Sequence, residues 1–170
     1  TTSLVSATFP NGFGYSVTEN TFLSSGIYIG TASSNIFVKT ISFLSIGDFS
    51  TNIALSDIYH AEIGGGAKNI FALQGDNLNI GQKVHGLECK AFHDLLIGDF
   101  CTDIKAYNTW YVIEIGKYSS NIMAYLGARD VKIGNFCNNV YISSGSVSIG
   151  NKNTNIILRG GATDGNNKVV

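Results

Sequence analysis

Charged residues, proline and long apolar runs are scarce in this chain, and each scarcity excludes a class of protein. Lysine and arginine total 11 against 12 aspartates and glutamates, so the net charge of −1 gives nucleic acid no attractive field. No run of about 18 apolar residues occurs, so we expect no insertion into a membrane. The single proline and the scattered glycines do not match the composition of a linker.

Apolar residues, by contrast, are abundant. They make up 44% of the chain against 14% charged residues, and the mean hydropathy is +0.15. A chain of this composition is expected to bury surface against itself or against copies of itself. Its 170 residues are enough for one domain with a hydrophobic core.

An internal repeat dominates the sequence. The dipeptide Ile-Gly occurs eight times, and successive copies lie 17, 17, 17, 17, 18, 18 and 16 residues apart. The copies begin at Ile29, Ile46, Ile63, Ile80, Ile97, Ile115, Ile133 and Ile149. A nearly constant period of this length indicates a solenoid, in which each repeat buries its apolar residues against its neighbours.

Each repeat contains two short apolar-x-apolar pairs, which we number from the isoleucine of Ile-Gly as position 0. In the second repeat they are Leu44 with Ile46, at −2 and 0, and Ile53 with Leu55, at +7 and +9. A period of two residues is typical of a β-strand. Position +6 is always asparagine, aspartate or glycine, which predicts a corner where side chains can form a ladder. The glycine at +1 indicates a bend or a place without room for a side chain.

The predicted fold is an all-β, single-chain parallel β-solenoid of about eight coils of about 17 residues, with two main strands per coil. The left-handed hexapeptide helix of acyltransferases matches the first six residues of a repeat, as in "IGDFST". It requires an aliphatic residue at +6, where this chain has its corner residue. We therefore favour a right-handed or irregular solenoid. Residues 1–26 are predicted to be an N-terminal cap, residues 27–158 the repeats, and residues 159–170 a C-terminal loop leading to a missing or cleaved segment.

Patterns typical of metal sites and catalytic sites are missing. No Cys-x-x-Cys motif occurs, and we expect no metal, no cofactor and no catalytic residue. Cys101 and Cys137 occupy one repeat position two coils apart, about 9.6 Å, beyond the reach of a disulfide. With Cys89 they are predicted to be free, packed thiols. His93 and the adjacent Asp94 could form a general base and its orienting carboxylate, although an ordinary loop histidine is the simpler interpretation.

The segment "YNTWYVIE", from Tyr107 to Glu114, is the most distinctive departure from the repeat. It contains the single tryptophan and coincides with the lengthening of the repeat to 18 residues. Trp110 and Tyr111 could stack on a saccharide, and the candidate glycan-binding set also includes Tyr107, Tyr125 and Glu114. The same aromatic residues could instead fill a corner of the coil or contact a neighbouring subunit.

Positions +8 and +10 are expected to point outward from the second strand pair of each repeat. They are apolar or aromatic over much of the chain, for example at Phe37, Phe71 and Leu73. A monomer rarely exposes so long an apolar patch, so this face predicts a subunit interface or an aromatic platform for sugar rings. The outward position −1 of the first pair is more polar, which indicates a face exposed to solvent.

The repeats "IGDFSTNI", "IGDFCTDI", "IGKYSSNI" and "IGNFCNNV" resemble the β-helical shafts of phage tail fibres and tailspikes, over residues 27–158. The resemblance implies a homotrimer that is assembled in the host cytoplasm, is located in the virion tail and contacts a cell-surface polysaccharide. We therefore expect a structural and adhesive segment. A polysaccharide-degrading β-helix enzyme with carboxylates at coil corners, and a hexapeptide acyltransferase, remain alternatives.

Overall fold

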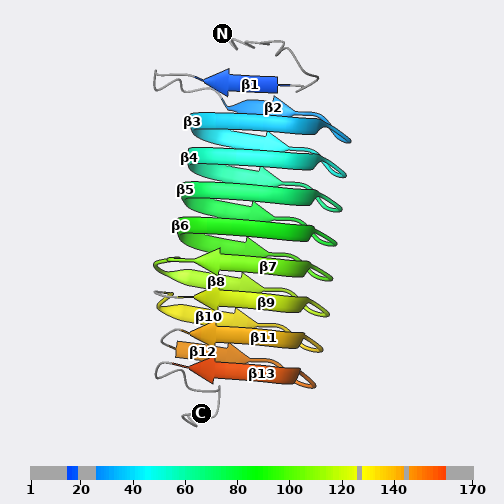
Figure 1. Ribbon diagram of the computed structural model, residues 1–170, viewed down its shortest axis with the longest axis vertical. Coiled ribbons are helices and arrows are strands. Elements are labelled where there is room, and N and C mark those ends of the chain that lie inside the picture. The colour runs from blue at the N-terminus through cyan, green and yellow to red at the C-terminus, as the bar shows by residue number, and fades with distance from the viewer. Residues whose placement is uncertain (1–14, 19–25, 126–127, 144–145, 160–170) are drawn as a thin grey trace.

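The structure is a computed structural model, and it describes residues 15–18, 26–125, 128–143 and 146–159. In these residues thirteen strands form one sheet, every strand pair is parallel, and there is no helix. The strands are β1 (Tyr15–Thr18), β2 (Ile27–Ile29), β3 (Ser34–Ile46), β4 (Thr51–Ile63), β5 (Lys68–Ile80), β6 (His85–Ile97), β7 (Thr102–Tyr107), β8 (Val112–Ile115), β9 (Ser120–Tyr125), β10 (Asp130–Ile133), β11 (Asn138–Ser143), β12 (Ser146–Ile149) and β13 (Thr154–Arg159). The predicted all-β parallel solenoid is confirmed (Figure 1).

Each coil begins with a tight turn after Ile-Gly and then sweeps once around the rod. In the upper coils a single 13-residue strand such as β4 makes the whole sweep, whereas lower coils divide it between two strands, such as β7 and β8. Ile53 pairs with Ile36 in the coil above and with Ile70 in the coil below. One coil is therefore one 17-residue repeat, and identical repeat positions lie side by side.

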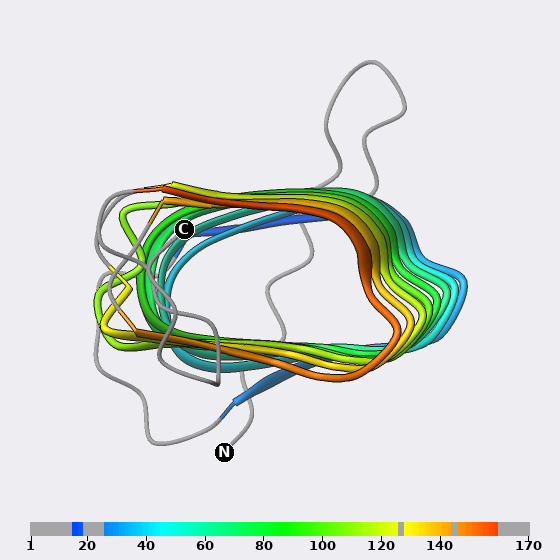
Figure 2. The ribbon, with the colours of Figure 1, turned by 90° about the horizontal axis from the view of Figure 1, so that it is seen from below.

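The solenoid is right-handed (Figures 1 and 2). In Figure 2, where the C-terminal coils are nearest the viewer, β12 runs to the right along the lower edge and β13 runs to the left along the upper edge. The chain therefore turns anticlockwise as it approaches the viewer, which is the right-handed sense favoured for crossovers between parallel strands.

The predicted ladder lies at the +6 corner, where every residue has φ between +52° and +76°. Asn52 donates its Nδ2–H to Asn35 Oδ1 at 3.0 Å, and Asn69 donates to Asn52 Oδ1 at 3.1 Å. Gly86 has no side chain and interrupts the ladder. Below it, side-chain bonds of 2.9–3.1 Å link Asp103, Asn121, Asn139 and Asn155. Asparagine suits this corner because it tolerates left-handed backbone and supplies both a donor and an acceptor.

The glycine at +1 is required by close approach between coils. A Cβ atom on Gly98 would lie 2.7 Å from the backbone nitrogen of Gln82, and one on Gly81 would lie 2.5 Å from that of Gly65. Neither glycine has a left-handed φ, so the lack of room for a side chain is the reason for this residue type. Of the two explanations offered by the sequence, this one is confirmed.

The core consists of the inward-facing columns at −2, 0, +7 and +9, which are buried through most of the rod. Large and small residues complement each other between coils: a Cβ atom on Gly75 would lie 2.3 Å from Cε1 of Phe92. Cys89, Cys101 and Cys137 are buried and free, as their spacing predicted. Burial raises the pKa of Cys89 to about 12.

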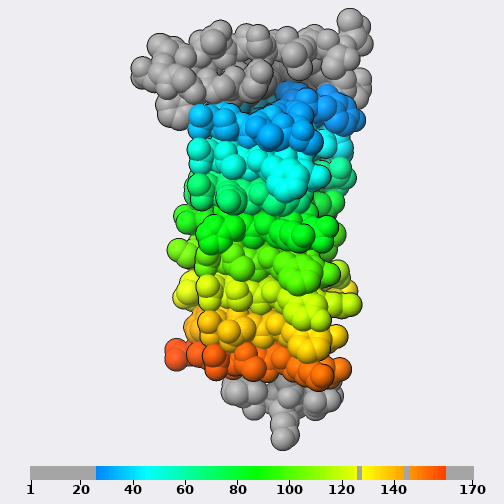
Figure 3. All heavy atoms as spheres, turned by 90° about the vertical axis from the view of Figure 1, so that its right-hand side faces the viewer, coloured from blue at the N-terminus to red at the C-terminus, as the bar shows by residue number. Residues whose placement is uncertain are grey.

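The two predicted terminal segments lie mostly outside the described residues. Within the first, β1 pairs in parallel with the start of β3, so that Tyr15 lies beside Ile36 and Thr18 beside Lys39. Residues 160–170 are not described. Figure 3 views the rod from the side of the tight turns, where successive coils stack as even layers without a deep hollow.

Candidate functional site

The bend between β7 and β8, and its equivalents in the other coils, lies on the left in Figure 1, opposite the tight turns. A column of mostly exposed aromatic and ionisable side chains follows this bend from coil to coil. The strand register places Tyr59, Asp76, His93, Tyr111 and Arg129 at equivalent positions of successive coils. We call these five residues, together with Trp110, the bend strip. The strip combines exposed aromatic rings with a histidine–carboxylate pair.

His93 is the centre of the bend strip. Its Nδ1 lies 2.7 Å from Oδ1 of Asp76, and its ring lies 5.7 Å from Trp110 and 5.3 Å from Tyr111 between centroids. In the neutral imidazole, the carboxylate of Asp76 accepts the Nδ1–H and thereby places the lone pair on Nε2. Among the described residues, none hydrogen-bonds Nε2, so this atom is available to a ligand.

The pairing of His93 with Asp94 that the sequence suggested is wrong. The partner is Asp76, and Oδ1 of Asp94 is buried without a hydrogen bond among the described residues. Asp76 lies 17 residues before His93, which is one coil. The repeat length therefore predicts this pair, because polar residues one repeat apart lie side by side just as the apolar residues do.

The extra residue of the 18-residue coil explains the exposure of Trp110. Thr109 is buried with 1% of its surface accessible, whereas Trp110 and Tyr111 are 61% and 50% exposed. Both aromatic residues still donate backbone N–H groups to the coil above, Trp110 to Phe92 at 2.9 Å and Tyr111 to His93 at 3.0 Å. The two predicted aromatic residues are thus held together by main-chain bonds and project outward.

The other three predicted residues lie elsewhere. Tyr107 and Tyr125 belong to the sheet of β7 and β9, where their rings stack 5.6 Å apart at an interplanar angle of 2°. Lys90 Nζ lies 5.5 Å from the Tyr107 ring, and Tyr141 packs on Tyr125 at 5.1 Å. Neighbouring side chains therefore cover their ring faces.

Glu114 lies on the opposite side of the rod, in β8, and forms an ion pair with Lys132. This pairing raises the pKa of Lys132, mainly through the hydrogen bond to the carboxylate. The five predicted residues thus occupy three separate surfaces, and only two pairs of them are brought together.

A second aromatic ladder, which the sequence analysis missed, lies at the tight turns. Phe100, Tyr118 and Phe136 stack with centroids 5.0 and 4.8 Å apart and nearly parallel planes, and Lys152 lies 5.2 Å from the Phe136 ring. The signal was an aromatic residue at position +3 of four repeats. Because each ring covers its neighbour's face, this turn ladder presents mainly ring edges.

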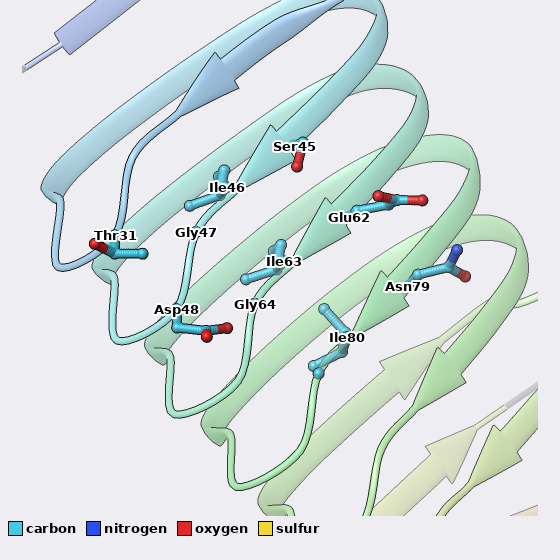
Figure 4. Close-up of a pocket in the computed structure, with 11 residues that line it drawn as sticks. Thr31, Ser45, Ile46, Gly47, Asp48, Glu62, Ile63, Gly64, Asn79 and Ile80 are labelled. Carbon is cyan, nitrogen blue, oxygen red and sulfur yellow. The ribbon is translucent and has the colours of Figure 1, made fainter.

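An open groove of about 490 Å³ runs along the rod beside the upper tight turns. Figure 4 shows Ser45, Glu62 and Asn79 in a row on the strands, with Asp48 in the turn. Asp48 Oδ1 accepts the backbone N–H of Gly65 at 2.7 Å, so this carboxylate joins successive turns. Glu62 contacts His60 at 3.3 Å. Both carboxylates already have protein partners, and no group of three metal-ligating side chains occurs in the described residues.

Comparison of the chain with protein-family models, with curated proteins and with solved structures found no match. The part of the chain that the structure describes has no helix able to cross a membrane.

Proposed function

We propose that this chain is a structural and adhesive segment of a phage tail fibre or tailspike, which assembles as a trimer and contacts a cell-envelope glycan. The observation that carries the proposal is a long surface on one side of the rod that is apolar or aromatic over much of its length. We call it the outer face; it consists of positions +8 and +10 on β3 to β7, β9, β11 and β13. Phe37, Phe71, Leu73 and Ile157 on this face are exposed. The phage assignment rests on the resemblance of the repeats.

Two of the charged side chains on the outer face, Lys90 and Glu88, are paired within the chain. Lys90 Nζ lies 3.4 Å from a carboxylate oxygen of Glu88 and also lies over the rings of Phe71 and Tyr107, 6.0 and 5.5 Å from their centroids. Burying these two side chains together leaves neither of the two charges uncompensated, which lowers the desolvation cost of association at this point of the face.

The size of the outer face fits a subunit contact. Eight coils about 4.8 Å apart extend about 38 Å, and a six-residue strand extends about 20 Å, which gives roughly 760 Å². A stable interface buries about 800 Å² on each partner. The face is therefore large enough to hold copies of the chain together side by side.

Native mass spectrometry of the wild type and two matched variants tests the assembly. Leu73→Glu places a charge on the outer face, whereas Leu96→Glu does so on the opposite side of the rod, and the two leucines are 41% and 39% exposed. We expect the first variant to dissociate and the second to remain a trimer, because a charge buried without a partner opposes association. A wild-type chain that stays monomeric at micromolar concentration would contradict the proposal.

A further inference from the structure

We infer that the bend strip is a saccharide-binding subsite, in which Trp110 stacks on a pyranose ring and His93, oriented by Asp76, hydrogen-bonds a hydroxyl group. The inference deepens the proposed function and rests on its glycan contact. It assigns that contact to one edge of the rod and to residues from three successive coils.

A free ring face is the first requirement for stacking on a sugar, and it separates Trp110 from the rings of the tyrosine pair and of the turn ladder. In the tyrosine pair and in the turn ladder, neighbouring rings or cations cover the ring faces. Trp110 instead touches His93 at a tilt of 34° and keeps 61% of its surface accessible. Its indole is also large and apolar, with an N–H that can bond a hydroxyl.

An oriented polar group beside the ring is the second requirement, because a sugar has hydroxyl groups around its apolar face. His93 satisfies it, since the bond from Nδ1 to Asp76 fixes the ring and leaves Nε2 to accept a hydroxyl proton. The side chain of Asp76 is only 24% exposed and that of His93 is 47% exposed, so the carboxylate supports the imidazole from a more sheltered position.

The bend strip is also long enough for an extended saccharide along the rod. Tyr59 lies two coils above His93 and is exposed, and Arg129 lies two coils below it, so the five stacked positions span about 19 Å. Aromatic and hydrogen-bonding groups both occur over this distance. A chain of several sugar units therefore fits the strip better than a compact ligand does.

The single tryptophan makes the subsite directly observable, because all tryptophan emission comes from Trp110. The probes are methyl glycosides of glucose, galactose, mannose and N-acetylglucosamine, together with purified capsular polysaccharides and lipopolysaccharide O-chains. We expect at least one polysaccharide to change the emission saturably. In calorimetry with that polysaccharide, Trp110→Ala should weaken binding about tenfold or more, and His93→Ala roughly three- to tenfold.

Phe136→Ala is the matched control, since it removes an exposed ring from the turn ladder, and we expect unchanged affinity. If Trp110→Ala binds like the wild type while Tyr107→Ala or Tyr125→Ala does not, the subsite assignment is wrong and glycan recognition stands. If no polysaccharide binds the wild type in either assay, the subsite and the adhesive part of the proposed function both fail. The trimer is judged separately by mass spectrometry.

Discussion

Replacing Gly98 with alanine tests how closely successive coils approach each other. The new Cβ atom would lie 2.7 Å from Gln82 N and from Gly81 C, whereas ordinary contact begins at 3.4 Å. The coils must therefore separate locally by about 0.7 Å, which is the difference between these distances. This separation opposes the hydrogen bond from Gly98 N to Ile80 O, which joins the same two coils at 2.9 Å. Overpacking of this kind costs about 1–3 kcal/mol in the free energy of unfolding.

Gly30→Ala is the matched control in the first Ile-Gly pair. No described atom lies within 4 Å of a Cβ atom at Gly30, and its φ is not left-handed. Alanine there should be neutral, or should stabilise by about 0.4–1 kcal/mol through the unfolded chain. Urea denaturation followed by circular dichroism measures both variants. Equal midpoints for the two variants would refute the idea that glycine is required by coil spacing.

Two further predictions concern the ladder gap and the buried thiol. Gly86→Asn should fill the gap in the ladder, because Gly86 already has a left-handed φ of 76° and a Cβ atom there would lie 3.5 Å from Asn69 Oδ1. We expect the free energy of unfolding to rise by about 0.5–1.5 kcal/mol, which would appear as a higher urea midpoint. A lower midpoint than the wild type would show that the gap is not an unfilled ladder position. Burial holds the pKa of Cys89 near 12 against an ordinary value of 9.0. The neutral thiol therefore contributes fully to the stability of the fold below about pH 9, and this contribution is lost as the pH rises toward 12. Thermal melts from pH 8 to 11 should therefore show a smaller alkaline loss for Cys89→Ala than for the wild type, and identical slopes would contradict this.

The sequence indicated the corner at +6 but not the one at +11. Residues at position +11 also have left-handed backbone, with φ of 56° at Asp57, 61° at Gln74 and 56° at Ala91. No residue type is shared between coils at this position, so no sequence signal exists. The corner forms because the inward residues on either side must both reach the core, and this requirement imposes the local backbone despite its cost of about 1–2 kcal/mol per residue.

The candidate site was predictable only in part, for a similar reason. Trp110 and Tyr111 were found because they interrupt the repeat, which is a local property of the sequence. The role of His93 depends on Asp76 in the coil above, and the covered faces of Tyr107 and Tyr125 depend on neighbours in adjacent coils. Contacts between coils became visible only with the register.

The sequence by itself determined the strand type, the coil length, the inward columns and the asparagine corner, because each follows from spacing repeated eight times. A repeated spacing constrains stacking directly, since identical positions must meet one coil apart. Only the tertiary structure decided the handedness, the corner at +11 and the groups that meet at the bend strip. These depend on the direction in which the chain closes each coil and on side chains that occur once, which no repeated spacing encodes.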